Sequence, residues 1–271
     1  GDANRDGSET LPEKGWWRSI NIQNEGSAVL EWSTLAYGGR SDNSILLKSG
    51  SGSLRISNCS FIDSSGEGLR VSAGYSLFES SNNYFGDNST GLRLGINASF
   101  SDLTSQFEGN DLDIHLDGGA INTNVVWGAS SNYSMVASGD ITIAAGASLE
   151  VKEGTEIKFR QNNRIIVYGH LEAKGREDAP INFTDFRNDL VGGDANRDVD
   201  ETLTEVGWWR SISLLNEGTA SFDYCIIGYL GASDRAGVIK NSTGAFSMLN
   251  STIHDVKGDG LRIDNAAGGT E

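Results

Sequence analysis

"SFIDSSGEGLRV" (60–71), "YFGDNSTGLRL" (84–94) and "QFEGNDLDIHL" (106–116) are three versions of one phrase, and "TIHDVKGDGLRI" (252–263) is a fourth. Phe61, Phe85 and Phe107 recur after 24 and then 22 residues. Each version ends in a run of alternating apolar and polar residues, which is typical of a β-strand with one buried face. Gly, Asn, Asp and Ser punctuate the phrase, so each period predicts short strands joined by tight turns.

A period of 22–24 residues fits one coil of a solenoid. A single coil cannot bury its inward side chains, whereas stacked coils pair their backbones and bury ladders of like residues. Leucine-rich repeats have this length but a different pattern, and propeller blades need ~40 residues or more. The sequence therefore predicts an all-β, parallel β-helix with 22–24-residue coils. The expected inward ladders are Phe61–Phe85–Phe107 and Leu69–Leu92–Ile114.

The sequence also contains a longer repeat, in addition to this short period. "GDANRDGSETLPEKGWWRSI" at Gly1 returns as "GDANRDVDETLTEVGWWRSI" at Gly193, an offset of 192 residues, and 19 of the first 26 positions are identical. The short cadence breaks within 117–140, which predicts a junction near residue 130. We therefore expect coils over 1–130 that end one repeat, and coils over 131–271 that begin the next.

The segment 141–189 carries a resemblance to known proteins. It contains the phrase G-x-L-x-A-x-G-x-x-x-x-P-I-x-F-T, from Gly169 to Thr184. This phrase resembles the opening coils of right-handed parallel β-helix proteins, the pectate-lyase-like superfamily in the broad sense, found in large secreted bacterial surface proteins. The resemblance covers nearly the whole chain and implies right-handed coils and an extracellular, cell-surface location. It does not select a function, because this fold carries lyases, hydrolases, adhesins and inert scaffolds.

The acidic loop that is present twice has the ligand spacing of a calcium loop. Oxygen-bearing residues at positions 1, 3, 5, 9 and 12, with a turn at position 6, are the EF-hand pattern, which a hard cation with six or seven oxygen ligands requires. In the first copy these positions are Asp2, Asn4, Asp6, Thr10 and Glu13, with Gly7 at the turn. In the second copy they are Asp194, Asn196, Asp198, Thr202 and Glu205, with Val199 at the turn.

Two features separate the loop from an EF-hand. Val199 replaces the turn glycine in the second copy, and no helix is expected on either side. The loop more closely resembles the D-x-N-x-D-G loops of dockerins and of bacterial β-helix proteins. That resemblance implies that upstream acids can serve as ligands, and Asp185 and Asp189 are the candidates here. We expect Ca²⁺ as the only cofactor; the alternative is a solvated acidic turn, since Asp, Asn and Gly favour turns.

Two further groups could bind glycans. The Trp pair after each acidic loop could stack on sugar, with Trp17 and Trp209 as candidates, or could plug the wall where the loop rejoins it. Arg70 and Arg93 should point outward, with His115 in register. Such a ladder could bind a polyanion such as a uronate chain, or could be a solvated row balanced by acids including Glu67 and Asp113.

No catalytic residue is assigned. Lyases of this superfamily use calcium with an Arg or Lys base, but no Asp cluster lies in register on an adjacent strand. A hydrolase needs a close carboxylate pair, for which the segment "GNDLDIHLDGG" offers Asp111, Asp113 and Asp117. The three histidines share no metal-binding spacing.

Net charge and apolar content limit the classes of partner that the chain can bind. A net charge of −16 disfavours nucleic acid, and no apolar run reaches the ~20 residues of a membrane-spanning helix. Cys59 and Cys225 occupy non-equivalent repeat positions and are expected to be separate buried thiols. We hypothesise a non-catalytic, calcium-stabilised structural or adhesive module that binds calcium and adjacent repeats or further copies end to end. The alternative is a calcium-dependent lyase or glycan-binding module acting on acidic polysaccharide.

Overall fold

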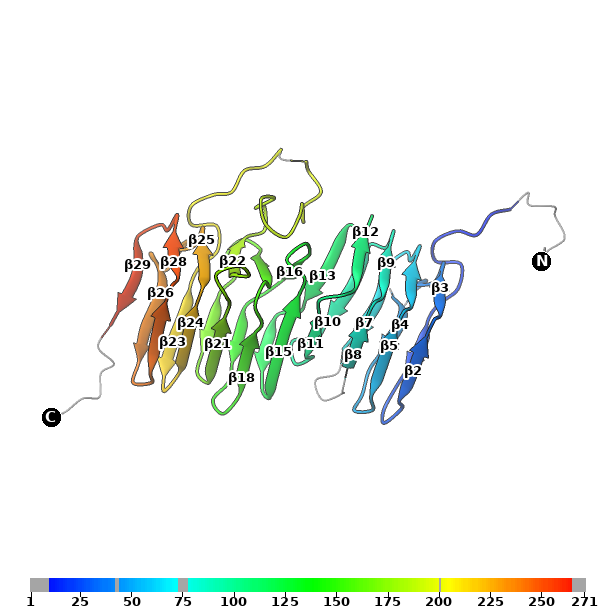
Figure 1. Ribbon diagram of the computed structural model, residues 1–271, viewed down its shortest axis with the longest axis horizontal. Helices are drawn as coiled ribbons and strands as arrows, with labels where there is room; N and C mark the ends of the chain where they lie inside the picture. Colours follow the sequence, from blue (N-terminus) through cyan, green and yellow to red (C-terminus); the bar gives the residue numbers. More distant parts are fainter. Residues whose placement is uncertain (1–9, 42–43, 73–77, 200, 265–271) are drawn as a thin grey trace.

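The chain folds into a parallel β-solenoid of about 10 turns of roughly 24 residues (Figure 1). The computed structural model describes residues 10–41, 44–72, 78–199 and 201–264. Within these ranges there are 29 strands and no helix. The prediction of an all-β, parallel β-helix is therefore confirmed.

The strands form five sheets, whose members are as follows. The ten-stranded sheet contains β1 (Ile20–Ile22), β4 (Ser44–Lys48), β7 (Glu67–Val71), β10 (Thr90–Leu94), β13 (Leu112–Leu116), β16 (Ser134–Ala137), β19 (Glu156–Phe159), β22 (Ile181–Asp185), β25 (Cys225–Gly228) and β28 (Thr252–His254). One six-stranded sheet contains β11 (Phe100–Asp102), β15 (Asn124–Ala129), β18 (Ser148–Val151), β21 (His170–Lys174), β24 (Thr219–Asp223) and β27 (Phe246–Leu249). The other contains β14 (Gly119–Ile121), β17 (Ile141–Ile143), β20 (Ile165–Val167), β23 (Ile212–Asn216), β26 (Ala236–Ser242) and β29 (Asp259–Ile263). The four-stranded sheet contains β3 (Thr34–Ala36), β6 (Ser60–Ile62), β9 (Tyr84–Gly86) and β12 (Gln106–Glu108). The three-stranded sheet contains β2 (Ala28–Glu31), β5 (Leu54–Ser57) and β8 (Phe78–Ser81).

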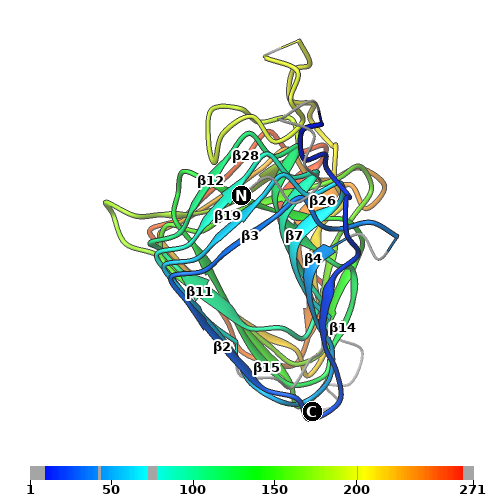
Figure 2. The ribbon, with the colours of Figure 1, turned by 90° about the vertical axis from the view of Figure 1, so that its right-hand side faces the viewer.

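Viewed along its length, the solenoid has three walls (Figure 2). The ten-stranded sheet passes from one wall to another at β13, which pairs with β10 on one side and β16 on the other. In Figure 2, β4 and β7 lie on the right-hand wall with β26, whereas β19 and β28 lie on the upper-left wall with β3. The break in the cadence falls at this change of wall, and parallel pairing continues across residue 130.

Ladders of like residues fill the interior, as the period predicts. Phe61, Phe85 and Phe107 stack in register, with ring centroids 5.1 and 4.8 Å apart. Leu69, Leu92 and Ile114 are likewise in register and fully buried.

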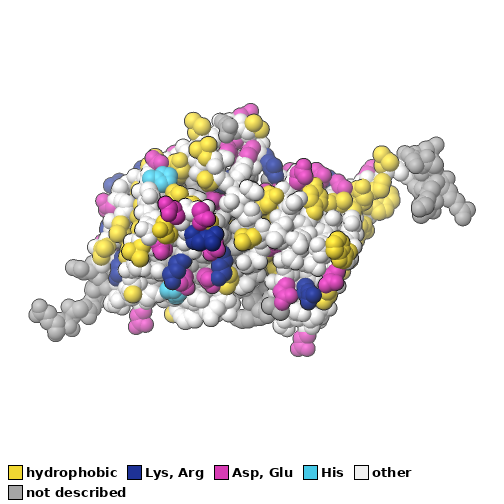
Figure 3. Space-filling model, viewed as in Figure 1, with side chains coloured by type: hydrophobic (Ala, Val, Ile, Leu, Met, Phe, Trp, Pro, Cys, Tyr) yellow, Lys and Arg dark blue, Asp and Glu magenta, His cyan; other side chains and the backbone are white. Residues whose placement is uncertain are grey.

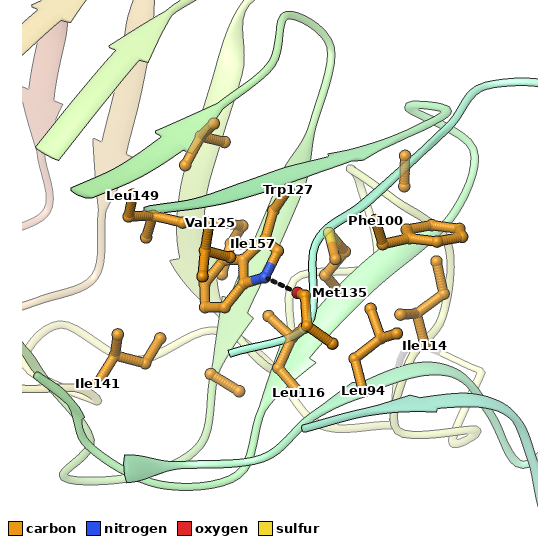
Figure 4. Packing of buried hydrophobic residues seen from close by; sticks show 14 of the residues in the cluster. Leu94, Phe100, Ile114, Leu116, Val125, Trp127, Met135, Ile141, Leu149 and Ile157 are labelled. Atoms are coloured by element: carbon orange, nitrogen blue, oxygen red, sulfur yellow. Dashed lines mark hydrogen bonds between the residues drawn. The ribbon is translucent and has the colours of Figure 1, made fainter. Parts of the chain in front are cut away.

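The change of wall has its own packing (Figure 4). There the fully buried Trp127 lies among aliphatic side chains, and its indole N–H donates to the carbonyl of Ala98 at 3.1 Å. Both cysteines are buried free thiols, as expected, and burial raises the pKa of Cys225 to about 12.

Candidate metal centre

The second acidic loop lies within a segment inserted between two coils. Residues 186–211 connect β22 to β23, and Figure 1 shows this segment above the strands, with a part that turns back toward β16. Gly192 (φ 62°) passes so close to the wall that a Cβ there would lie 2.9 Å from the Ser134 Cβ and 3.0 Å from the Glu156 Cβ. The loop is therefore held against the outer face of β16 and β19.

An apolar contact and an ion pair hold the loop further along the axis. Ala195 packs with Leu112 and Val136 in a small cluster outside the main core, and Phe186 contacts this cluster. The Arg197 guanidinium lies 3.4 Å from an Asp113 carboxylate oxygen, 84 residues earlier in the chain. The loop thus spans the coils at which the ten-stranded sheet changes wall.

Three carboxylates converge at the base of the loop. One oxygen each from Asp189, Asp194 and Asp198 lies within 4.8 Å of the others. Calcium–oxygen bonds are about 2.3–2.6 Å long, so oxygens around one ion lie no more than about 5 Å apart. The spacing therefore fits one hard cation.

Asp194 organises the turn that brings these groups together. Its carboxylate accepts hydrogen bonds from the backbone N–H of Arg197 (2.6 Å) and Val199 (3.0 Å). Burial alone would raise the pKa of Asp194, but these N–H groups favour the carboxylate and the pKa lies below its ordinary value. Val199 itself adopts φ 54°, so the turn forms without glycine, in a conformation that disfavours β-branched residues.

Two oxygens near the cluster accept no hydrogen bond within the described chain. They are Asp198 Oδ1 and Asn196 Oδ1, both inaccessible to solvent. The other Asp198 oxygen accepts from the Asn196 amide (2.8 Å) and the Thr202 N–H (3.0 Å). Buried oxygens that lack a donor are costly unless something satisfies them, and a cation would do so.

A buried lysine and a buried glutamate lie beneath the loop, and sequence analysis missed both. Lys158 is fully buried on β19, and its ammonium donates to the carbonyl of Gly193. Burial lowers the pKa of Lys158 to about 8, against the opposing effect of the acids Asp189, Glu156 and Asp194. Alternation in "EIKF" places both side chains on the outer face, but nothing local reveals that an insertion about 30 residues later covers them.

The other predicted ligands lie elsewhere. Asp185 is fully buried; its oxygens accept from the Arg187 guanidinium (2.8 Å) and the Glu205 N–H (2.9 Å). The Glu205 carboxylate is exposed and lies 3.6 Å from the same guanidinium. These residues form an ion-pair group distinct from the three converging aspartates. In the first copy, Asp2, Asn4 and Asp6 lie outside the described residues, and Glu13 is exposed.

The Trp candidates lie in the walls. Trp209 is fully buried, stacks on Phe159 with centroids 4.2 Å apart, and donates to the carbonyl of Gly228 at 2.7 Å. Trp17 is partly buried and donates to the carbonyl of Ala36, also at 2.7 Å. Because Ala36 and Gly228 are 192 residues apart, both repeats use this Trp in the same way. This arrangement corresponds to the plug rather than to a sugar platform.

The basic ladder is in register, and of its two arginines only Arg93 is held in ion pairs, because Arg70 Nε has no hydrogen-bond partner among the described residues. Arg93 pairs with Arg70 on one side and His115 on the other in the sheet. Its guanidinium lies 3.2 Å from Glu67 and 2.8 Å from Asp117. Burial, reinforced by Arg93, lowers the pKa of His115 to about 4, so this ring is neutral at pH 7.

Comparisons of the chain with protein-family models, with curated proteins and with solved structures found no match. Among the described residues, no helix has the length and apolarity that crossing a membrane requires.

Proposed function

We propose that this chain is a calcium-stabilised structural and adhesive β-helix module of an extracellular, cell-surface repeat protein, and that it is not catalytic. The convergence of Asp189, Asp194 and Asp198 beneath a loop that the sequence contains twice carries this proposal. Lys158 supplies one positive charge below three negative ones. A divalent cation would offset the remainder.

The position of the loop suggests what calcium would do. The loop contacts β13, β16 and β19, where the ten-stranded sheet changes wall. A cation that fixes the loop would therefore brace coils that are far apart in sequence. This bracing role favours a scaffold over the alternative lyase. Of the two ladder arginines, Arg93 is held between Glu67 and Asp117, whereas Arg70 Nε has no hydrogen-bond partner among the described residues.

The repeat also indicates how neighbouring copies would pack. Leu11, Trp16, Val29 and Trp32 of the first coil are 64–81% exposed, and Figure 3 shows hydrophobic side chains gathered at that end. In the second repeat the preceding coil covers part of the equivalent surface: Trp208, which matches Trp16, donates to the carbonyl of Phe159 at 3.0 Å, whereas Leu203, which matches Leu11, is 77% exposed. A coil of an adjacent repeat is the partner that this chemistry fits.

Calcium should raise the thermal stability of the chain, and Asp194→Ala should lessen that rise. A ligand that binds only the native state adds about 2.7 kcal/mol at a hundredfold excess over its Kd, or about 5–10 °C in Tm for a chain of this size. We would measure melting by circular dichroism in millimolar calcium and in chelator.

Asp178→Ala is the matched control, because Asp178 is an exposed acid outside the loop. It should keep the full calcium response, and Asp194→Ala should keep only a contribution from the first copy. Equal melting of the wild type with calcium and with chelator would show that the loops are acidic turns.

A further inference from the structure

A groove runs along the corner opposite the acidic loop's wall, where β14, β17, β20 and β23 turn into β15, β18, β21 and β24. It has a volume of about 780 Å³ and is lined from four successive coils. The turn 144–147 contains only Ala and Gly, so no long side chain fills the space above it. The following turn is tightly stacked, because a Cβ at Gly169 would lie 2.2 Å from the Ala147 carbonyl oxygen.

One side of the groove is a ladder of polar side chains. Asn124, Ser148, His170 and Thr219 pair in register on β15, β18, β21 and β24. The Ser148 hydroxyl donates to the Asn124 amide oxygen (3.0 Å), and the His170 Nδ1 lies 2.7 Å from the Thr219 hydroxyl. Parallel coils rise ~4.8 Å each, so four rows present hydrogen-bonding groups over about 14 Å.

The remaining lining supplies an aromatic ring and unused polar groups. Tyr168 lies half-buried in the groove, so one part of its ring is available for contact. Within the described chain, the Tyr168 hydroxyl and the Glu217 carboxylate form no side-chain hydrogen bond or ion pair, and both line the groove. An aromatic surface beside a row of donors and acceptors can stack on one face of a ligand and bind its hydroxyl groups.

The charge of the lining selects among such ligands. No Lys or Arg lines the groove, and Glu217 is its single carboxylate. The chain as a whole carries −16. An acidic ligand would therefore meet no counter-charge and an unfavourable long-range field.

We propose that this corner groove binds a short stretch of a neutral polysaccharide along the solenoid axis, with Tyr168 stacked on a sugar ring and the Asn124–Ser148–His170–Thr219 ladder bonded to its hydroxyls. The site would account for adhesion by a surface unrelated to the acidic loop. It does not depend on calcium, so the two proposals fail separately.

The test is isothermal titration of the full chain, in chelator, with cello-, xylo-, manno- and laminari-tetraose, and with trigalacturonate as the acidic probe. We expect at least one neutral tetrasaccharide to bind and trigalacturonate not to bind. Tyr168→Ala should weaken binding about tenfold, as loss of an aromatic contact does.

Tyr84→Ala is the matched control, because Tyr84 is also a half-buried tyrosine but lies on β9, outside the groove. It should leave binding unchanged. Binding of none of the neutral tetrasaccharides at millimolar concentration would overturn the proposal. A loss of binding in Tyr84→Ala with retention in Tyr168→Ala would also overturn it, since the sugar would then bind on the wall that contains β9.

Discussion

Phe85→Ala should lower the free energy of unfolding by about 3–5 kcal/mol, the usual result of removing a large aromatic side chain from a core. Phe85 is fully buried and stacks between Phe61 and Phe107, with centroids 5.1 and 4.8 Å away. Each coil of a solenoid contacts only its neighbours, so the cavity would weaken two coil–coil interfaces at once. Urea unfolding followed by circular dichroism measures the loss.

Tyr84→Ala provides the control from the same strand. Its side chain points to the outer face, where the hydroxyl donates to the Glu108 carboxylate at 3.2 Å. Its loss should cost less than about 1 kcal/mol, as surface substitutions generally do. If the two variants were equally destabilised, Phe85 would not be a core ladder residue.

The sequence predicts the ladders because the period of the pattern equals the length of a coil. Residues that recur every 22–24 positions must lie above one another once coils stack, and the registers Phe61↔Phe85 and Leu69↔Leu92 follow from this alone. The same reasoning places Arg93 between Arg70 and His115. It could not predict that the ten-stranded sheet changes wall at β13, because that change depends on how a coil with an irregular spacing fills the interior around Trp127.

The acidic loop was predictable as a motif but not as a site. The EF-hand spacing predicts Asp194, Asp198 and Glu205 as ligands with equal weight. The structure brings Asp194 and Asp198 together. It places Glu205 beside Arg187, away from them. The difference arises from the path of an insertion over a wall, which no local pattern encodes. For the same reason the burial of Lys158 and Glu156 could not be foreseen, although it dominates the electrostatics beneath the loop.

Replacing Glu156 is the second substitution with a large expected effect on stability, because this carboxyl group is buried with few hydrogen bonds to stabilise its charge. It is 5% exposed on β19; one carboxylate oxygen accepts from the Asn182 amide at 3.0 Å, and the other is buried without a hydrogen bond. Burial raises the pKa of Glu156 from 4.5 to about 7, although the Asn182 hydrogen bond and Lys158 act in the opposite direction. The protein therefore prefers this side chain protonated.

Relative to Glu156→Gln, the wild type should lose stability as the pH rises from about 5 to 8. The comparison with the variant isolates Glu156, because His115, whose pKa is about 4 in the folded protein, acts in the opposite direction below pH 6.5. Between pH 4.5 and about 7 the folded state binds the Glu156 proton more tightly than the unfolded state, so its stabilising contribution is complete below 4.5 and lost above 7. The contribution of Glu156 to the free energy of unfolding that is lost over this pH range amounts to about 3 kcal/mol. Urea unfolding in chelator at pH 5, 6, 7 and 8 tests this. The exposed Glu177→Gln is the control and should follow the wild type. Parallel pH profiles for the wild type and Glu156→Gln would mean that Glu156 ionises normally, which would require solvent to reach it beneath the loop.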